Sequence, residues 1–386
     1  MSNLKNFDKD IVYLDNNATT FIDPKIMAEI NNSFLYGNAS SMHISGRVAH
    51  EAVEEARKNV ATLLHGKDKC IIFTSGASES NNTVFNLPQK GRILTTTVEH
   101  PSIRESVKYL KSQGREVTDI NVDNTGAVRL DELEQELKKG DVSLVSVMAA
   151  NNESGTIQPY KEAAKLAHKY GALFHTDATQ AIGKVPLDVK NDEIDYLSLS
   201  GHKFYAPKGV GALYVNENAP FEVFMHGGHQ EDGRRAGTYN TPAIYGMGLA
   251  AEMLIKDNGN ENKRLWALRE KLRKGIEEKI DDILINSPLE YEHCLPGTLN
   301  VSFPRSEGES ILLLLDYHRI CVSTGSACAT GSLEPSYVLL AQGIPIEAAH
   351  GSIRFSFGKF NTEKDVDKVL EVLPPIIKKL RSWSTR

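Results

Sequence analysis

The chain has 386 residues, which at roughly 100–200 residues per domain predicts two domains, or one large domain with an appendage. Its 44 Lys and Arg against 50 Asp and Glu give a formal net charge of −6, which excludes a protein built mainly to coat nucleic acid. No apolar run approaches the roughly 18 residues of a membrane-spanning helix, and residues 1–10 lack an apolar segment of signal-peptide length. We therefore expect a cytoplasmic protein without membrane or direct nucleic-acid partners.

From about residue 70 to residue 215, short β-rich runs alternate with helix-like segments, and a further helix is expected upstream. Residues 46–64 form an expected long helix, because their apolar side chains fall near helical spacing. Seven β-rich runs follow at residues 70–74, 93–97, 116–120, 144–149, 172–175, 196–199 and 211–215, with amphipathic segments at 102–113, 130–138 and 160–170 between several of them. This alternation predicts an α/β fold with a mostly parallel seven-stranded sheet.

The C-terminal part differs in pattern. Expected helices at 241–255 and 260–280 are interrupted by the polar stretch 257–261, our candidate domain boundary. Strands at 298–303 and 352–357, a helix at 309–317 and a final helix from 362 follow. The predicted organisation is a large domain of residues 15–257 and a smaller α+β domain of residues 1–14 and 258–386.

Polar motifs directly after the strands deserve the most weight, because ligands of such sheets bind beyond the carboxyl ends of the strands. Small residues and hydroxyls at 74–81 (TSGASESN) follow the first strand. They would leave backbone N–H groups free to hold an anion at a helix N-terminus. The alternative is an ordinary helix start capped by Ser78 or Ser80. Neither a dinucleotide-binding glycine motif nor a P-loop is present in the sequence.

Two charged side chains follow later strands. Asp177 ends an apolar strand, where a carboxylate needs a cation or a strong donor; a salt bridge or a helix cap would explain it equally. Lys203 lies in the small-residue turn SGHK and is a candidate Schiff-base amine, although a solvated surface lysine is the simpler reading. Together, an anion cradle, a carboxylate and a lysine are the groups needed to hold pyridoxal phosphate.

Longer motifs support this combination. They are YLDNNATT at 13–20, NASSMHISGR at 38–47, VEHP at 98–101, NNESG at 151–155, GGHQE at 227–231 and IRFS at 353–356. With these motifs the chain resembles, over nearly its whole length, the cysteine desulfurases of the NifS/IscS type (group I), in the class V branch of fold-type-I pyridoxal-phosphate-dependent transferases. Departures from the family pattern are mild. Ser78 stands where the family usually has Thr, Ser154 stands where it usually has Thr or Ile, and the residues after the cysteine are ATG at 329–331.

The resemblance implies roles for individual residues. Lys203 would bind the cofactor covalently and move a proton at the substrate Cα, Asp177 would pair with the ring nitrogen, and His100 would stack on the ring and assist proton transfer. Arg354 would bind the substrate carboxylate, and Asn152 would also contact the substrate. The further cofactor-binding residues implied by the family are Ala77, Ser78, Asn152, Gln180, Ser200, Gly201, His202 and, from the neighbouring subunit of a homodimer, Thr238.

Four cysteines without a C-x-x-C pair indicate neither a disulfide framework nor a zinc site, so each is read singly. Cys70, Cys294 and Cys321 fit the usual role of a small buried hydrophobe. Cys328 lies among small residues at 322–332, which suit a mobile tether better than core packing. The resemblance to the cysteine desulfurases implies that Cys328 is the nucleophile. No metal site of the chain's own is implied, although Cys328 could be shared with an iron–sulfur cluster on a scaffold protein.

The implied function is removal of sulfur from L-cysteine, giving L-alanine and a persulfide on Cys328 that a U-type scaffold protein receives for iron–sulfur cluster assembly. Two alternatives remain. One is a related class V enzyme, either a selenocysteine lyase or an aminotransferase; the thiol of Cys328 speaks against the aminotransferase. The other is a non-catalytic subunit that binds an iron–sulfur scaffold, against which Lys203, Asp177, His100 and Cys328 speak together.

Overall fold

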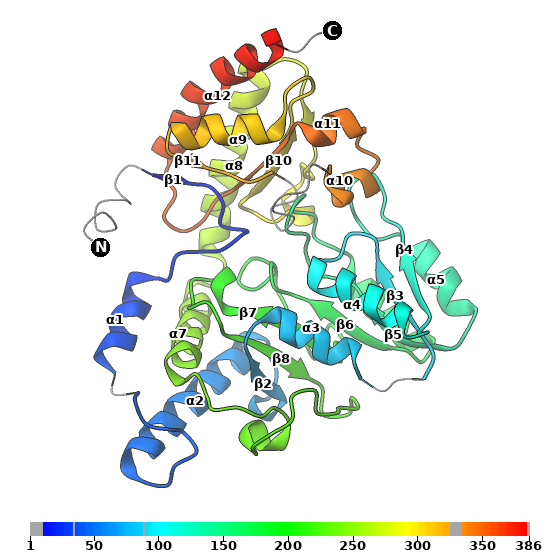
Figure 1. Cartoon of the computed structure of the whole chain (residues 1–386), viewed down its shortest axis with the longest axis vertical. Helices are drawn as coiled ribbons and strands as arrows, with labels where there is room; N and C mark the ends of the chain where they lie inside the picture. Colours follow the sequence, from blue (N-terminus) through cyan, green and yellow to red (C-terminus); the bar gives the residue numbers. More distant parts are fainter. Residues whose placement is uncertain (1–10, 34, 88–89, 325–333, 384–386) are drawn as a thin grey trace.

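The computed structural model describes residues 11–33, 35–87, 90–324 and 334–383, which form two lobes (Figure 1). The helices are α1 (Pro24–Asn32), α2 (Ile44–Leu63), α3 (Ala77–Phe85), α4 (Pro101–Ser112), α5 (Leu130–Lys138), α6 (Tyr160–Lys169), α7 (Thr241–Asp257), α8 (Asn260–Lys279), α9 (Gly308–Tyr317), α10 (Tyr337–Ala341), α11 (Ile346–His350) and α12 (Glu363–Trp383). The strands are β1 (Val12–Tyr13), β2 (Ile71–Thr74), β3 (Arg92–Thr96), β4 (Val117–Ile120), β5 (Val142–Ser146), β6 (Leu173–Asp177), β7 (Tyr196–Ser200), β8 (Gly211–Val215), β9 (Leu284–Ile285), β10 (Thr298–Ser302), β11 (Ile320–Cys321) and β12 (Ser352–Ser356).

The larger lobe is built on a seven-stranded sheet in the order β2-β8-β7-β6-β5-β3-β4. Strand β8 runs antiparallel to both of its neighbours, whereas the other neighbouring strands are parallel. The predicted α/β fold with a mostly parallel seven-stranded sheet is therefore confirmed. Because β2 runs in the same direction as β7, the carboxyl ends of β2, β6 and β7 lie at one edge of the sheet.

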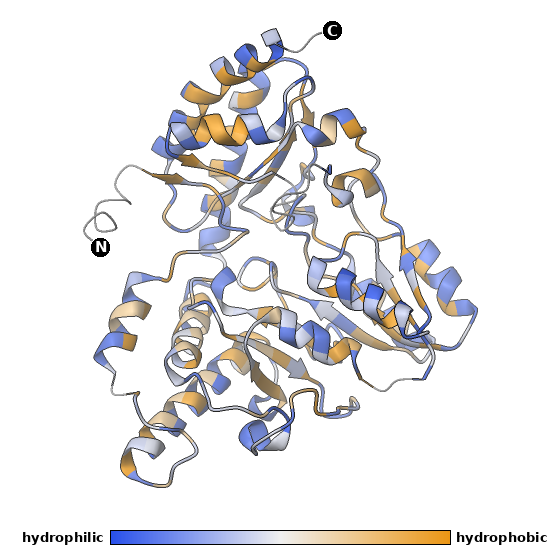
Figure 2. Cartoon of the chain, in the orientation of Figure 1, coloured by the Kyte–Doolittle hydropathy of each residue, from blue (hydrophilic) through white to orange (hydrophobic). Residues whose placement is uncertain are grey.

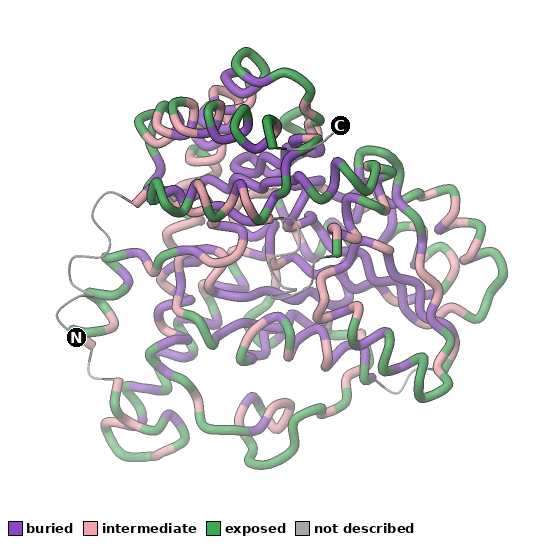
Figure 3. Tube along the Cα trace, turned by 45° about the horizontal axis from the view of Figure 1, so that its top comes forward, coloured by how far each residue is buried: buried purple, intermediate pink, exposed green. Residues whose placement is uncertain are grey.

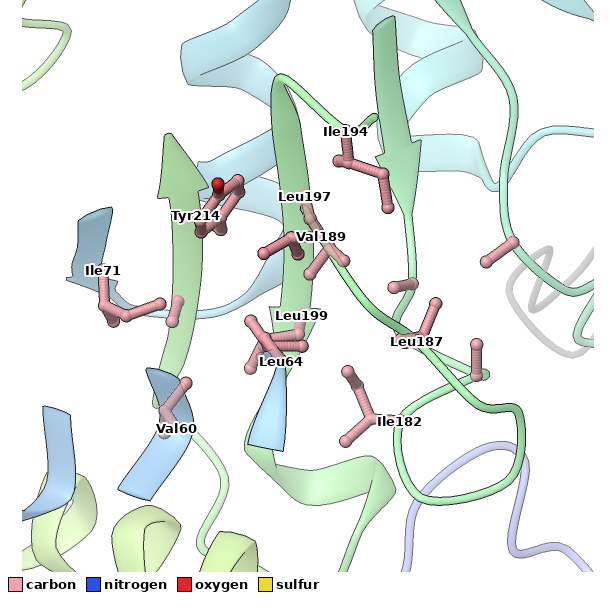
Figure 4. Packing of buried hydrophobic residues seen from close by; sticks show 14 of the residues in the cluster. Val60, Leu64, Ile71, Ile182, Leu187, Val189, Ile194, Leu197, Leu199 and Tyr214 are labelled. Carbon is pink, nitrogen blue, oxygen red and sulfur yellow. The ribbon is translucent and has the colours of Figure 1, made fainter. Parts of the chain in front are cut away.

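Both faces of this sheet are covered by helices, because successive side chains along a strand point to opposite faces. Ile71, Leu197 and Leu199 pack on one face with residues of α2, α6 and α7, as Figure 4 shows for part of this cluster. Ile72 and Tyr196, each adjacent in sequence to one of these, pack on the other face with α3 and α4. Most residues of these strands are accordingly buried, whereas exposed residues lie mainly on the outer helices and loops (Figure 3).

The smaller lobe has its own apolar cluster. Residues of α8, α9 and α12 pack against the antiparallel sheet β12-β10-β9 and the pair β1-β11. Hydrophobic and hydrophilic residues alternate around α12, as expected for a helix with one face on a core (Figure 2). Val12 and Leu14 belong to this cluster although 250 residues separate them from α8. The domain boundaries at residues 14/15 and 257/258 stay a prediction.

The predicted elements differ from the observed ones mainly at their ends. The strand expected at 144–149 spans Val142–Ser146; beyond it, Val147 and Ala149 still donate hydrogen bonds to β6, but the ladder is no longer regular. Helices α1, α10 and α11 and strands β1, β9 and β11 were not predicted, because such short elements carry little periodicity. Among the described residues, no helix is long and apolar enough to cross a membrane.

Candidate active site

A cavity of about 970 Å³ is lined by residues at or just after the carboxyl ends of β2, β6 and β7 and by residues of the smaller lobe. This edge is where ligands of open α/β sheets bind. The cavity brings together residues from eight separate segments of the chain, including the loop before α1, the start of α4 and β12. Ten predicted site residues line it, namely Ala77, Ser78, His100, Asn152, Asp177, Gln180, Ser200, His202, Lys203 and Arg354.

Lys203 reaches the cavity from a single 3₁₀ turn, Gly201–Lys203, directly after β7. Its Nζ donates hydrogen bonds to the backbone oxygens of Asn17 at 2.6 Å and Ala18 at 2.8 Å. Gly201 itself does not line the cavity. A Cβ on Gly201 would lie 3.1 Å from the side chains of both Ala206 and Val210, so this glycine permits the tight turn that carries the lysine.

Asp177, the last residue of β6, is 3% exposed and keeps its carboxylate satisfied by neutral donors. Asn81 Nδ2 donates to one carboxylate oxygen at 2.8 Å, and the backbone N–H of Thr179 donates to the other at 2.9 Å. No salt bridge accounts for this carboxylate within the described residues, so the salt-bridge alternative fails. A buried carboxylate held only by neutral donors is available to pair with a cationic ligand group.

His100 caps the N-terminus of α4, with Nδ1 accepting from the backbone N–H of Ser102 at 3.1 Å. Burial lowers the pKa of His100; the charge of Asp177 opposes this effect and that of Lys203 adds to it. Burial, with Lys203 and other cations nearby, also lowers the pKa of His202 to about 4. Both imidazoles are therefore neutral at physiological pH, and each offers one nitrogen that donates a hydrogen bond and one that accepts.

The turn between β2 and α3 forms the expected anion cradle. Gly76 precedes α3 with φ of +155°, which favours glycine, and no side chain caps this helix. A Cβ on Gly211 of the neighbouring β8 would lie 2.6 Å from Gly76 Cα, so this turn can approach β8 closely because Gly211 has no side chain. The alternative of a helix start capped by Ser78 or Ser80 is therefore not observed, and the first N–H groups of α3 remain available to an anion.

Arg354 enters the cavity from β12 and is 1% exposed. Its Nη1 donates to the backbone oxygen of Asn152 at 2.9 Å, and its Nη2 pairs with Asp15 at 2.7 Å. Nε is buried and has no partner among the described residues. An unpaired buried donor is costly, and a carboxylate bound at this guanidinium would satisfy it.

Asn17 is the site residue that the sequence interpretation left without a role. Its backbone oxygen accepts from Lys203 and, at 2.9 Å, from Gln180 Nε2. Its side-chain Nδ2 donates to the backbone oxygen of Asn152 at 3.1 Å. The motif at 13–20 was a signal for this position, but only the fold shows that Asn17 joins three parts of the site.

Two buried carboxyl groups flank the cavity and were also missed, although both lie in motifs that the sequence displays. Glu99 accepts from Thr96 Oγ1 and from the backbone N–H of Met148, each at 2.9 Å, and burial raises its pKa to about 8. Glu153 accepts from Ser336 Oγ, and burial raises its pKa to about 7.

Thr238 lies exposed and outside the cavity of its own chain. Its loop is fixed by two ion pairs: Arg235 binds Glu79 of α3 at 2.8 Å, and Glu231 binds Arg57 of α2 at 2.7 Å. Cys328 lies outside the described residues. Among those that are described, no three His, Cys, Asp or Glu side chains gather in a metal-binding arrangement.

The Glu231–Arg57 pair predicts a large stability effect. Replacing Glu231 by alanine leaves the buried Arg57 guanidinium with only the half-exposed Glu54 as counter-ion, so we expect the free energy of unfolding to fall by about 3–5 kcal/mol. Urea denaturation of the apoprotein measures this. The control Glu252→Ala, which breaks an exposed pair with Lys256, should cost about 0.5 kcal/mol or less. Equal losses in the two variants would refute the structural role of the buried pair.

Comparison with known proteins agrees with the geometry. The Aminotransferase class-V family matches residues 12–369. A cysteine desulfurase of Nostoc sp. is 46% identical over 381 residues, covering 97% of this chain and 94% of its own, and the cysteine desulfurase NifS of Azotobacter vinelandii is 45% identical with the same coverage. The solved structure of a NifS-like protein matches with a TM-score of 0.88 and 38% identity, covering 96% of this chain and all of its own. The chain therefore belongs to the aminotransferase class-V family and, within it, to the cysteine desulfurases.

Proposed function

We propose that this protein is a pyridoxal-phosphate-dependent cysteine desulfurase. The observation that carries the proposal is the convergence of Lys203, Asp177 and Arg354 on one cavity, each from a different part of the chain. A lysine amine, a buried carboxylate and a buried guanidinium with an unpaired Nε are the groups needed for a cofactor aldehyde, a ring nitrogen and an amino-acid carboxylate.

The residues present fit pyridoxal phosphate. The uncapped N-terminus of α3, with Ala77 and Ser78, would take the phosphate together with Ser200 and His202. Asp177 would pair with the ring nitrogen, and Asn152 and Gln180 would contact the ring substituents. When bound, this cofactor withdraws electrons from the substrate Cα.

The chain's own residues then have separate tasks. Arg354 holds the carboxylate of L-cysteine, which fixes the direction of the substrate side chain. Lys203 holds the cofactor covalently and moves a proton at the substrate Cα, while the neutral His100 is placed to assist that transfer.

Sulfur transfer requires the thiolate of Cys328. Its Sγ attacks the substrate sulfur; a new S–S bond forms as the substrate Cβ–S bond breaks, and the electron pair of the broken bond stays with the carbon skeleton. That skeleton takes up a proton and leaves as L-alanine. The net change, cysteine plus enzyme thiol to alanine plus enzyme persulfide, needs no external oxidant or reductant.

The destination of the sulfur and the assembly state belong to the same proposal. A U-type iron–sulfur scaffold protein would receive the persulfide sulfur, and the protein would work as a cytoplasmic homodimer. In such a dimer, the exposed Thr238 of one subunit would reach the phosphate of the other. The ion pairs that fix its loop, and its position outside the lining of its own cavity, support this arrangement.

The direct test is incubation of the purified protein with L-cysteine. We expect one alanine to form for each L-cysteine consumed and, with a reducing thiol present, sulfide to be released as well. The purified holoenzyme should be yellow and show a visible absorption band. An alanine yield no higher than in a protein-free control would refute the proposed activity. Alanine produced only from selenocysteine would favour the lyase instead.

Asp177→Asn should retain the fold and the bound cofactor but lower turnover by about 100-fold or more. The amide cannot pair ionically with a protonated ring nitrogen, so the electron-withdrawing power of the cofactor falls. Alanine formation by the variant, with its cofactor content measured from absorbance, checks this. The control Asn81→Ala removes one donor to Asp177 and keeps the carboxylate, so its loss should be much smaller. Near-normal turnover in Asp177→Asn would remove Asp177 from the mechanism.

A further inference from the structure

The segment that follows residues 325–333 leads into α10 and forms part of the cavity wall. Glu334, Pro335 and Tyr337 line the cavity. Two hydrogen bonds attach this segment to the larger lobe: Ser336 Oγ donates to a carboxylate oxygen of Glu153, and Tyr337 OH donates to the backbone oxygen of Glu99 at 2.6 Å. Ser336 therefore joins the smaller lobe to a side chain of the cavity wall.

Glu153, which accepts the hydrogen bond from Ser336, is held in place by its neighbours. The backbone N–H of Glu153 donates to Asn151 Oδ1 at 2.8 Å, and its backbone oxygen accepts from Asn300 Nδ2 at 3.2 Å. The adjacent Asn152 is held by Arg354. Glu153 is 4% exposed, and burial of a carboxyl group is unfavourable unless it is hydrogen-bonded. This environment fixes the Glu153 carboxyl beside the residue that we assign to the substrate carboxylate.

The donor of this hydrogen bond, Ser336, is held at the start of α10 and lies close in sequence to Cys328. Ser336 Oγ also accepts from the backbone N–H of Leu339 at 3.2 Å and so begins α10. Cys328 precedes Ser336 by eight residues, a length that spans at most about 29 Å when extended. The position of Ser336 therefore limits how far from the cavity the Cys328 thiol can lie, and with it the effective concentration of thiol at the substrate.

We propose that Glu153 and Ser336 are positioning residues for sulfur transfer, an inference that rests on the proposed desulfurase function. Their contact fixes the end of the segment that bears Cys328 relative to Arg354. It serves the sulfur-transfer step and is not needed for cofactor binding or for the first reaction of the cofactor with L-cysteine.

Four single variants test the contact. Glu153→Ala removes the acceptor and leaves the hydroxyl cap of α10 in place, whereas Ser336→Ala removes a single oxygen atom. Both should lower alanine formation by about 10- to 100-fold, because a misplacement of about 1 Å at a reacting group has this effect. Glu153→Gln and Ser336→Thr keep an acceptor and a donor, so both should restore most of the activity. Cofactor absorbance and the rate of its change on adding L-cysteine should stay as in the wild type in all four variants.

Comparing the double variant with the two single variants shows whether Glu153 and Ser336 act through their mutual hydrogen bond or independently of each other. If both residues act through their mutual hydrogen bond, Glu153→Ala combined with Ser336→Ala should be no slower than the slower single variant. If the fold-losses in alanine formation of the two single variants multiply in the double variant, the proposal is overturned. A Glu153→Gln variant as slow as Glu153→Ala would also overturn it, since the carboxyl would then take part in proton transfer itself.

Hydrogen exchange provides a readout that does not depend on turnover. In the cofactor-free protein, the amides of residues 336–341 should exchange at least about tenfold faster in Glu153→Ala than in the wild type, with little change in the central sheet. Unchanged exchange in this segment would contradict the positioning role. Failure of the wild-type protein to form alanine would instead refute the proposed function, so the two failures are distinguishable.

Discussion

Replacing Lys203 by alanine should abolish the yellow colour of the purified protein and lower alanine formation from L-cysteine by about 10⁴-fold or more. Lys203 is the amine that the turn after β7 brings into the cavity, and two backbone carbonyls orient its Nζ. Alanine offers no group that could bind the cofactor covalently or move a proton at the substrate Cα. The fold should persist, because the turn itself depends on Gly201 and not on the lysine side chain.

The measurement for Lys203 is borohydride reduction of the holoenzyme followed by peptide mapping. The pyridoxyl group should be found on Lys203 in the wild-type protein and be absent from the variant. Lys208 also lines the cavity but is exposed, which makes Lys208→Ala a matched control that should keep both the label and the activity. A pyridoxyl group on Lys208 would show that the assignment is wrong.

Cys328→Ser should abolish alanine release and persulfide formation together, by about 10³-fold or more, while cofactor binding is unaltered. A serine hydroxyl is hardly ionised at neutral pH and attacks sulfur poorly, whereas a cysteine supplies some thiolate. The steps before sulfur transfer do not use this thiol, so L-cysteine should still change the cofactor spectrum of the variant. Mass spectrometry of the wild-type protein after brief exposure to L-cysteine should find one added sulfur on Cys328.

The other cysteines serve as controls for this experiment. Burial raises the pKa of Cys294 to about 11 and also raises the pKa of the half-buried Cys321, so neither thiol is ionised at neutral pH. Cys294→Ser and Cys321→Ser should therefore retain alanine formation. Added sulfur on either of these residues would end the direct-attack mechanism for Cys328, and normal turnover in Cys328→Ser would do the same. A selenocysteine lyase independent of this thiol would then be the better reading.

The fold class and the residues at the ends of the strands could be predicted from the amino-acid sequence. Alternating apolar runs and amphipathic segments predict a sheet covered on both faces, because side-chain periodicity is a local property of the chain. Asp177 and Lys203 could be found for the same reason, since each directly follows a predicted strand and parallel strands end at one edge.

The contacts that connect the parts of the site could not be predicted, because they join residues far apart in the chain. Asn17 binds Lys203, 186 residues further along the chain; Arg57 binds Glu231 across 174 residues; and Ser336 binds Glu153 across 183. The antiparallel insertion of β8 between β2 and β7, which brings Gly211 against Gly76, is equally non-local. No periodicity encodes such pairs, because they depend on how whole elements pack and on which buried polar groups must then find partners.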